Sequence, residues 1–189
     1  MKASIDNIFG KNEKIIITID DYKYEFIINK QEAIVEFLDN KYIIDATKIV
    51  KNMYPHIYKF HSKDNSYYEE FDQVYSFKLP INIIQPSKFF LNKDLINEID
   101  KNINPENIYL PVAIINDEYV LLDGHHRLYA LNENYIKMVN VYIKEYSKEI
   151  PDYVYIAKEG NIKNISQLHV LEKDEYEKYW NEFLKQFEF

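Results

Sequence analysis

Hydrophobic and polar positions alternate in short segments near the start of the chain. Residues 14–19 are rich in β-branched side chains, and Asp20-Asp21 has the composition of a turn. Residues 22–28 begin with the apolar–polar alternation of a hairpin partner. Residues 32–38 fit either a strand or a helix, because so short a run has no decisive period. The pattern predicts a β-hairpin over residues 14–28.

The next segment predicts a helix and a boundary. Residues 41–44 favour a further strand, and residues 46–54 favour a short helix that ends at Pro55. Residues 61–72 are polar and have no clear period, which is typical of a loop between regions. We therefore expect residues 1–72 to form a small β-rich region with one helix.

Strands and helices alternate through residues 73–145, where the pattern favours a mixed sheet. The predicted elements are an alternating segment at 73–83, a helix at 92–101 with Asn92 as its N-cap, strands at 109–115 and 119–122 joined by a turn, a helix at 126–132 and a strand at 138–143. Together with the first region, these elements indicate the α+β class.

Residues 146–189 are predicted to form a C-terminal helical extension packed on this core. Residues 152–157 fit an extended or a helical segment, and residues 174–187 have the spacing of an amphipathic helix. Its aromatic stripe is expected to pack as core and consists of Tyr176, Tyr179, Trp180, Phe183 and Phe187.

Charge and composition exclude several classes of function. The net charge is −8 and no basic run occurs, which disfavours nucleic-acid binding through clustered cations. The chain has no cysteine, so it can hold neither a disulfide nor a catalytic thiolate. No apolar run approaches the roughly 18 residues of a membrane helix, and the N-terminus lacks the apolar segment of a signal peptide. We therefore expect a cytoplasmic protein with no membrane partner.

Candidate chemistry is concentrated in one stretch, Asp123-Gly124-His125-His126-Arg127. Arg127 is the only arginine among 23 lysines and arginines, and Gly124 is one of three glycines. A strand that passes through glycine into a helix directs free backbone N–H groups at an anion, and a guanidinium adds a bidentate donor. Asp123 would repel phosphate unless Mg²⁺ lies between them or it holds a neighbouring side chain. Alternatively, Asp123 caps the helix and the two histidines only pack around it.

Two boxes in the sequence resemble the ParB/sulfiredoxin superfamily. The first is Ile84-Gln85-Pro86-Ser87, followed by the helix predicted at 92–101. The second runs from Leu122 to Leu131 and contains Asp-Gly-His-His-Arg. The resemblance is best over residues 83–143, and it implies a sulfiredoxin-like core that binds the phosphates of a nucleotide such as ATP, ADP or CTP.

The resemblance also implies roles for individual residues. Gly124 would allow close backbone approach, and His126 and Arg127 would contact phosphate oxygens. His125 takes the position of the sulfiredoxin cysteine or the ParB glutamate, and Gln85 and Ser87 belong to the nucleotide-binding first box. Sulfiredoxin activity is excluded because the chain has no cysteine.

The sequence departs from its relatives in two further ways. Tyr129 stands where ParB proteins have another arginine, which removes one cation that would contact phosphate. The kinase branch of the superfamily uses a carboxylate in the first box, and none occurs here before Asp94. Both departures leave open whether the protein is an enzyme.

Three functions therefore remain as expectations. The first is a nucleotide-binding protein that supports phosphotransfer or nucleotide hydrolysis on a small molecule, with Asp123 or His125 as the catalytic base and Mg²⁺ held at Asp123 through phosphate. The second is a non-catalytic regulatory module that retains the phosphate site and binds a protein through its acidic, tyrosine-rich surface. The third and weakest is DNA binding or nuclease activity.

Overall fold

The protein has an α+β fold that divides into two compact units. The structure is a computed structural model that describes residues 2–8, 13–99 and 104–184. The first unit comprises Met1–Ser76 and Asn102–Tyr109, and the second comprises Phe77–Lys101 and Leu110–Phe189. The division after Ser76 lies close to the boundary expected at residue 72. The return of a later segment to the first unit was not expected from the sequence.

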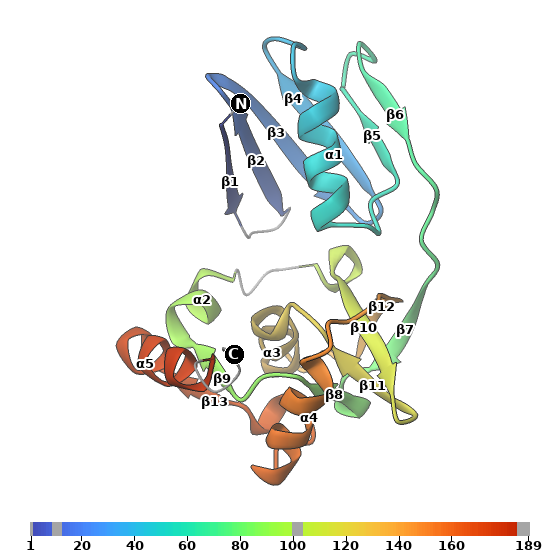
Figure 1. Ribbon diagram of the computed structural model, residues 1–189. Coiled ribbons are helices and arrows are strands. Elements are labelled where there is room, and N and C mark those ends of the chain that lie inside the picture. The colour runs from blue at the N-terminus through green and yellow to red at the C-terminus, as the bar shows by residue number, and fades with distance from the viewer. Residues whose placement is uncertain (1, 9–12, 100–103, 185–189) are drawn as a thin grey trace. The chain divides into compact units, whose positions relative to one another are not determined.

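The first unit is a six-stranded sheet with one helix on one face (Figure 1). The strands follow chain order, and every neighbouring pair is antiparallel except β4 and β5, which flank the helix in sequence and are parallel. The elements are β1 (Ala3–Ile8), β2 (Lys14–Ile19), β3 (Tyr22–Asn29), β4 (Glu32–Phe37), α1 (Ile43–Met53), β5 (Lys59–His61) and β6 (Tyr68–Glu70).

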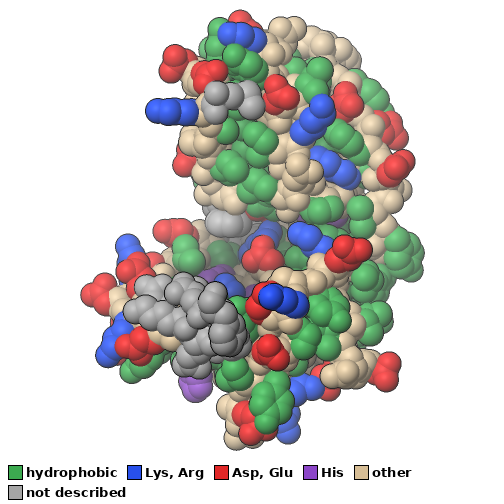
Figure 2. Space-filling view, viewed as in Figure 1, with side chains coloured by type: hydrophobic (Ala, Val, Ile, Leu, Met, Phe, Trp, Pro, Cys, Tyr) green, Lys and Arg blue, Asp and Glu red, His purple; other side chains and the backbone are tan. Residues whose placement is uncertain are grey.

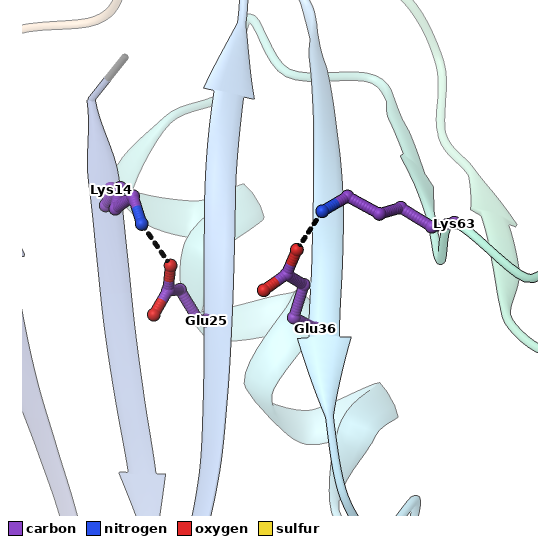
Figure 3. Close-up of polar contacts among 4 residues, drawn as sticks. All are labelled: Lys14, Glu25, Glu36 and Lys63. Atoms are coloured by element: carbon purple, nitrogen blue, oxygen red, sulfur yellow. Dashed lines mark hydrogen bonds and ion pairs between the residues drawn. The ribbon is translucent and has the colours of Figure 1, made fainter. Parts of the chain in front are cut away.

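Buried hydrophobic residues at every second position explain how α1 covers one face of this sheet. Every second residue of β2, β3 and β4 is buried against α1. The buried positions include Ile15, Ile17, Tyr24, Phe26 and Val35. The intervening positions form the opposite face, where Lys14 pairs with Glu25 at 2.6 Å and Lys63 pairs with Glu36 (Figure 3). One face of the sheet therefore packs in the core, and the other carries these ion pairs.

The hairpin predicted over residues 14–28 is confirmed, including its turn, where Asp20 has a φ of +48°. Residues 32–37 are a strand. The strand expected at 41–44 is wrong, because α1 begins at Ile43 and buries Ile43, Ala46 and Val50 on one helical face. The loop expected at 61–72 is also partly wrong, since it contains β6, which pairs with β5. Strand β1 was not predicted.

The second unit contains a mixed five-stranded sheet in the order β7-β12-β10-β11-β8. The strands are β7 (Ser76–Pro80), β8 (Ile84–Pro86), β10 (Tyr109–Ile115), β11 (Glu118–Leu121) and β12 (Met138–Ile143). Strand β11 pairs antiparallel with β10 and parallel with β8. A separate parallel pair joins β9 (Phe90–Asn92) to β13 (His169–Leu171). The hairpin of β10 and β11 and the strand β12 are confirmed.

Four helices accompany these strands: α2 (Lys93–Glu98), α3 (His125–Glu133), α4 (Ile150–Glu159) and α5 (Lys173–Leu184). Helix α4 packs Val154 against Ala113 and Val120 of the central hairpin. The N-cap of α2 is confirmed, since Asn92 Oδ1 accepts the backbone N–H of Asp94 at 2.9 Å. This helix ends earlier than expected, and residues 100–103 lie outside the described part.

The C-terminal helix begins at Lys173, close to its predicted start. Its aromatic stripe is only partly core, because Tyr179 is 44% exposed while Tyr176 and Trp180 are half-buried. The side chains of Phe183 and Phe187 lie outside the described residues. The segment predicted as extended or helical at 152–157 belongs to α4.

The surface mixes charges of both signs. On the face shown in Figure 2, acidic and basic side chains of the described residues are interspersed in both units. A nucleic-acid interface would need clustered cations, so this face gives no support to one. Among the described helices, none has the length and apolar character required to cross a membrane.

Candidate functional site

The turn that enters α3 requires glycine at position 124. Gly124 is the N-cap of α3 and has a φ of +81°, in the left-handed region that other residues rarely adopt. A Cβ atom there would lie 2.5 Å from Leu110 Cδ2 and 3.3 Å from Arg127 Nε. Local conformation and space therefore both explain this glycine.

His125 is buried at the first position of α3 and is already engaged with the fold. Its Nε2 accepts the backbone N–H of Ser87 at 3.1 Å. The Ser87 hydroxyl donates to the carbonyl of Leu121 at 2.6 Å. Burial lowers the pKa of His125 well below 6.5, so we assign a neutral ring with its proton on Nδ1. Nδ1 is buried and has no hydrogen-bond partner among the described residues.

His126 is also a neutral acceptor, but solvent reaches it. Its Nε2 accepts the backbone N–H of Asn92 at 3.0 Å, which ties α3 to β9. Burial, with a smaller effect from Lys88, lowers the pKa of His126 to about 4. Because Nε2 accepts a hydrogen bond, the proton of the neutral ring belongs on Nδ1, which is thus a donor for a ligand.

Arg127 lies one turn along α3 from Asp123. The arginine side chain is 12% exposed, whereas the aspartate side chain is 75% exposed, and their closest atoms, Nη2 and Oδ2, are 4.0 Å apart. Tyr142 of β12 is near both charges, and burial raises its pKa to about 12 while Arg127 opposes that rise. The guanidinium is therefore largely buried beside Gly124, and the carboxylate faces solvent.

Lys88 is a cation of this site that the sequence did not reveal. It follows β8 and is half-buried, and its electrostatic neighbours are Asp123, His125 and His126. Burial lowers the pKa of the Lys88 ammonium. Nζ lies 4.9 Å from the ring centroid of Trp180 and makes no hydrogen bond or ion pair with any described residue. In the sequence, only the two phenylalanines that follow Lys88 hint that it is partly buried.

We call Lys88, Asp123, Gly124, His126 and Arg127 the α3 cluster. The first hydrogen bond within α3 runs from the Leu128 N–H to the Gly124 carbonyl at 2.9 Å. The N–H groups of the three preceding residues therefore have no acceptor within the helix. Two cations and this positive helix end face a single exposed carboxylate, an arrangement that favours an anion.

Ser87 and Gln85, the two candidates from the first box, make hydrogen bonds to different parts of the second unit. Ser87 lies beside His125, but its N–H and hydroxyl are both used within the fold. The Gln85 amide donates to the carbonyls of Pro86 and Ile162, each at 2.9 Å, so it ties β8 to the segment after α4. Both side chains therefore donate their hydrogen bonds to backbone carbonyls of the protein and help to fix the segment around β8.

A metal at this site would depend on the ligand. No cluster of three or more acidic or histidine side chains suited to a metal occurs among the described residues. Asp123 would be the protein ligand of Mg²⁺, with phosphate oxygens and water completing the shell, as Mg²⁺ sites commonly do.

Comparison with known proteins adds little to this geometry. Neither a protein-family model nor a curated protein matches the sequence significantly. Among solved structures, the chain is similar to protein Atu1540 from Agrobacterium tumefaciens, with 15% identity and a TM-score of 0.36. That similarity covers 51% of this chain and 62% of the other, so the chain spans less than two thirds of that protein. Similarity at this level carries no information about activity.

Proposed function

We propose that this protein binds a nucleotide through its phosphates at the α3 cluster, as the ParB/sulfiredoxin superfamily that it resembles does. The observation that carries the proposal is Lys88, a half-buried ammonium with no carboxylate paired to it in the described structure. Burying a cation is unfavourable unless an opposite charge compensates it. A bound phosphate beside the start of α3, whose first N–H groups have no acceptor within the helix, would supply that charge.

The neighbouring groups fit the same ligand. His126 would offer its Nδ1–H as a donor that stays neutral and keeps its hydrogen bond from Asn92. Arg127 would add a guanidinium, and Gly124 lets the Arg127 side chain lie close to the backbone at the helix start. Asp123 would face the phosphates through Mg²⁺. The order α2, β10, β11, α3 and β12 also follows the element order on which the resemblance rests.

Binding is better supported than catalysis. His125 is a poor candidate for a general base, because its Nε2 lone pair receives the Ser87 N–H and its pKa lies far below neutrality. Asp123 is the remaining base candidate and is exposed. Since both imidazole acceptors are committed to backbone N–H groups, the geometry favours a non-catalytic nucleotide-binding module over a phosphotransferase or nucleotide hydrolase.

Thermal unfolding with ATP, ADP, CTP and GTP, each with and without Mg²⁺, tests this proposal. A nucleotide at one hundred times its Kd should stabilise the protein by about 2.7 kcal/mol and raise Tm by several degrees. Arg127→Ala and Lys88→Met should abolish most of the shift. Lys137→Ala is the matched control, because it removes an exposed cation beyond the far end of α3, roughly 14 Å from the cluster.

Each result has a distinct meaning. If no nucleotide shifts the wild type, nucleotide binding is refuted. If the shift survives both cluster substitutions, the ligand binds elsewhere. A shift that depends on the cluster but is accompanied by no turnover would favour the non-catalytic module.

A further inference from the structure

Two aromatic side chains of α5 contact the α3 cluster directly. The Trp180 ring lies under the Lys88 ammonium, 4.9 Å from Nζ to ring centroid. The Tyr176 ring meets the His126 ring edge-on at 6.3 Å. The two α5 rings are one helical turn apart and nearly parallel, with an interplanar angle of 7° and centroids 6.3 Å apart. The two rings therefore lie parallel and offset beside the cluster.

Tyr179 of the same helix makes a different contact from these two rings. Tyr179 is on the same helix but faces β9, where its ring lies 5.7 Å from that of Phe90. Tyr176 and Trp180 instead touch an imidazole and an ammonium of the candidate site, and both are only half-buried. Core packing alone would not require these contacts with an imidazole and an ammonium.

We propose that Tyr176 and Trp180 form the surface on which the base of the bound nucleotide stacks. This inference rests on the proposed function, since it places the base next to phosphates bound at α3. His126 and Lys88 each touch one of the rings and belong to the cluster, so base and phosphates would lie side by side, as they do in one nucleotide. Aromatic stacking tolerates any base, because every base has a π-face.

Paired titrations with ATP and inorganic tripolyphosphate, both with Mg²⁺, separate the base from the phosphates. Trp180 is the only tryptophan of the chain, so its fluorescence reports on this surface, and calorimetry gives the affinities independently. The wild type should bind ATP more tightly than tripolyphosphate. Trp180→Leu should weaken ATP binding about tenfold, a typical size for base stacking on an aromatic ring, and leave tripolyphosphate affinity nearly unchanged. GTP and CTP should behave as ATP does.

Conservative and control variants guard against a merely structural effect. Trp180→Phe should retain most of the preference for ATP, and Tyr176→Leu should weaken it. Tyr179→Leu, which alters the same helix away from the cluster, should leave it unchanged. If Trp180→Leu does not fold, Trp180→Phe and Tyr176→Leu carry the test.

Two results would overturn this inference and leave phosphate binding intact. One is equal wild-type affinity for ATP and tripolyphosphate. The other is a loss in Trp180→Leu that is the same for both ligands. If neither ligand binds the wild type, nucleotide binding at α3 fails, and the stacking surface fails with it.

Discussion

The open face of the first sheet carries ion pairs, whereas the lysine of the α3 cluster forms no ion pair with the described residues. On the sheet, Lys14 of β2 pairs with Glu25 of β3, and Lys63, which follows β5, pairs with Glu36 of β4 (Figure 3). In the cluster, Lys88 has no such partner among the described residues, and both histidines are neutral. The pKa of Lys14 is raised by its hydrogen bond with Glu25, whereas burial lowers the pKa of Lys88.

The lysines on the sheet face are therefore neutralised by glutamates of the protein, whereas Lys88 forms no ion pair with any described residue. The paired sheet face needs nothing further to explain its charges, since exposed ion pairs are common and contribute little. A half-buried cation beside an open helix N-terminus costs stability and is expected where an anion binds.

Gly124→Ala should have the largest effect on stability. The new Cβ would lie 2.5 Å from Leu110 Cδ2, and alanine would have to adopt a φ of +81°. Backbone strain and overpacking together should cost roughly 2–5 kcal/mol in denaturant unfolding. Gly160→Ala is the control, because a Cβ at Gly160 would come no closer than 3.4 Å to its neighbours and the φ there is −78°. Equal losses in the two variants would contradict this geometry.

Acidification should destabilise the α3 cluster before carboxylates are protonated. An unfolded histidine binds a proton near pH 6.5, whereas native His126 does so only near pH 4, and burial also holds the pKa of His125 well below 6.5. The unfolded state therefore binds more protons in this window, and stability falls as the pH falls from about 6.5 towards 4. The limit is roughly 1.4 kcal/mol per pH unit for one buried histidine, and His126 contributes less because solvent reaches it.

Stability measured against pH for wild type and His126→Gln checks this effect. Glutamine can still accept the Asn92 N–H, so the variant should fold and show a shallower fall between pH 6.5 and pH 4. In the first unit, hydrogen bonds from Ser62 and Ser66 lower the pKa of Asp64 to about 2, so its contribution is present above pH 3.8 and is lost only as the pH falls towards 2. A flat profile between pH 7 and pH 4.5 would contradict the assignment of neutral native histidines.

Lys88→Met should stabilise the ligand-free protein while removing nucleotide binding. Methionine keeps an apolar stem against Trp180 and removes a half-buried charge, so we expect a gain of roughly 1 kcal/mol in denaturant unfolding. Calorimetry on the same variant should show weakened ATP binding. A destabilised variant that still binds ATP would mean that Lys88 is structural.

The same substitution on the sheet, Lys14→Met, should have the smallest effect. It removes a partly exposed ion pair with Glu25, and pairs that water reaches contribute little to stability. Thermal unfolding should show little or no change, and ATP binding should equal that of the wild type. A gain in stability as large as that of Lys88→Met would remove the contrast between the two regions.

Local patterns in the sequence predicted the elements whose period is clear over several residues. Strands β2, β3, β10 and β12 are of this kind, because alternation or a buried apolar run is visible within each segment. The start of α1 was misassigned, since two adjacent isoleucines at 43 and 44 favour a strand by propensity while tertiary burial favours a helix. Strand β13 was missed because its partner β9 lies far away in the sequence, and β1 was missed because all of its residues are exposed.

The site was only partly visible in the sequence for the same reason. Gly124 and Arg127 stood out by rarity and position. The histidine roles depend on hydrogen bonds from Ser87 and Asn92, which are 38 and 34 residues away, so no local pattern could reveal them. Lys88 became a candidate only when folding placed it beside the start of α3, because lysine is common in this chain and no local motif distinguishes this one.

The most direct test of the central claim is the backbone amide spectrum of ¹⁵N-labelled protein titrated with ATP, ADP, CTP or GTP and Mg²⁺. Phosphate binding at the α3 cluster predicts that the amide signals of residues 124–127 shift, while those of β2 and β3 on the paired sheet do not. The N–H groups that begin α3 should move downfield as they acquire an acceptor. Unchanged signals at residues 124–127 with all four nucleotides, or shifts confined to the first unit, would contradict the account.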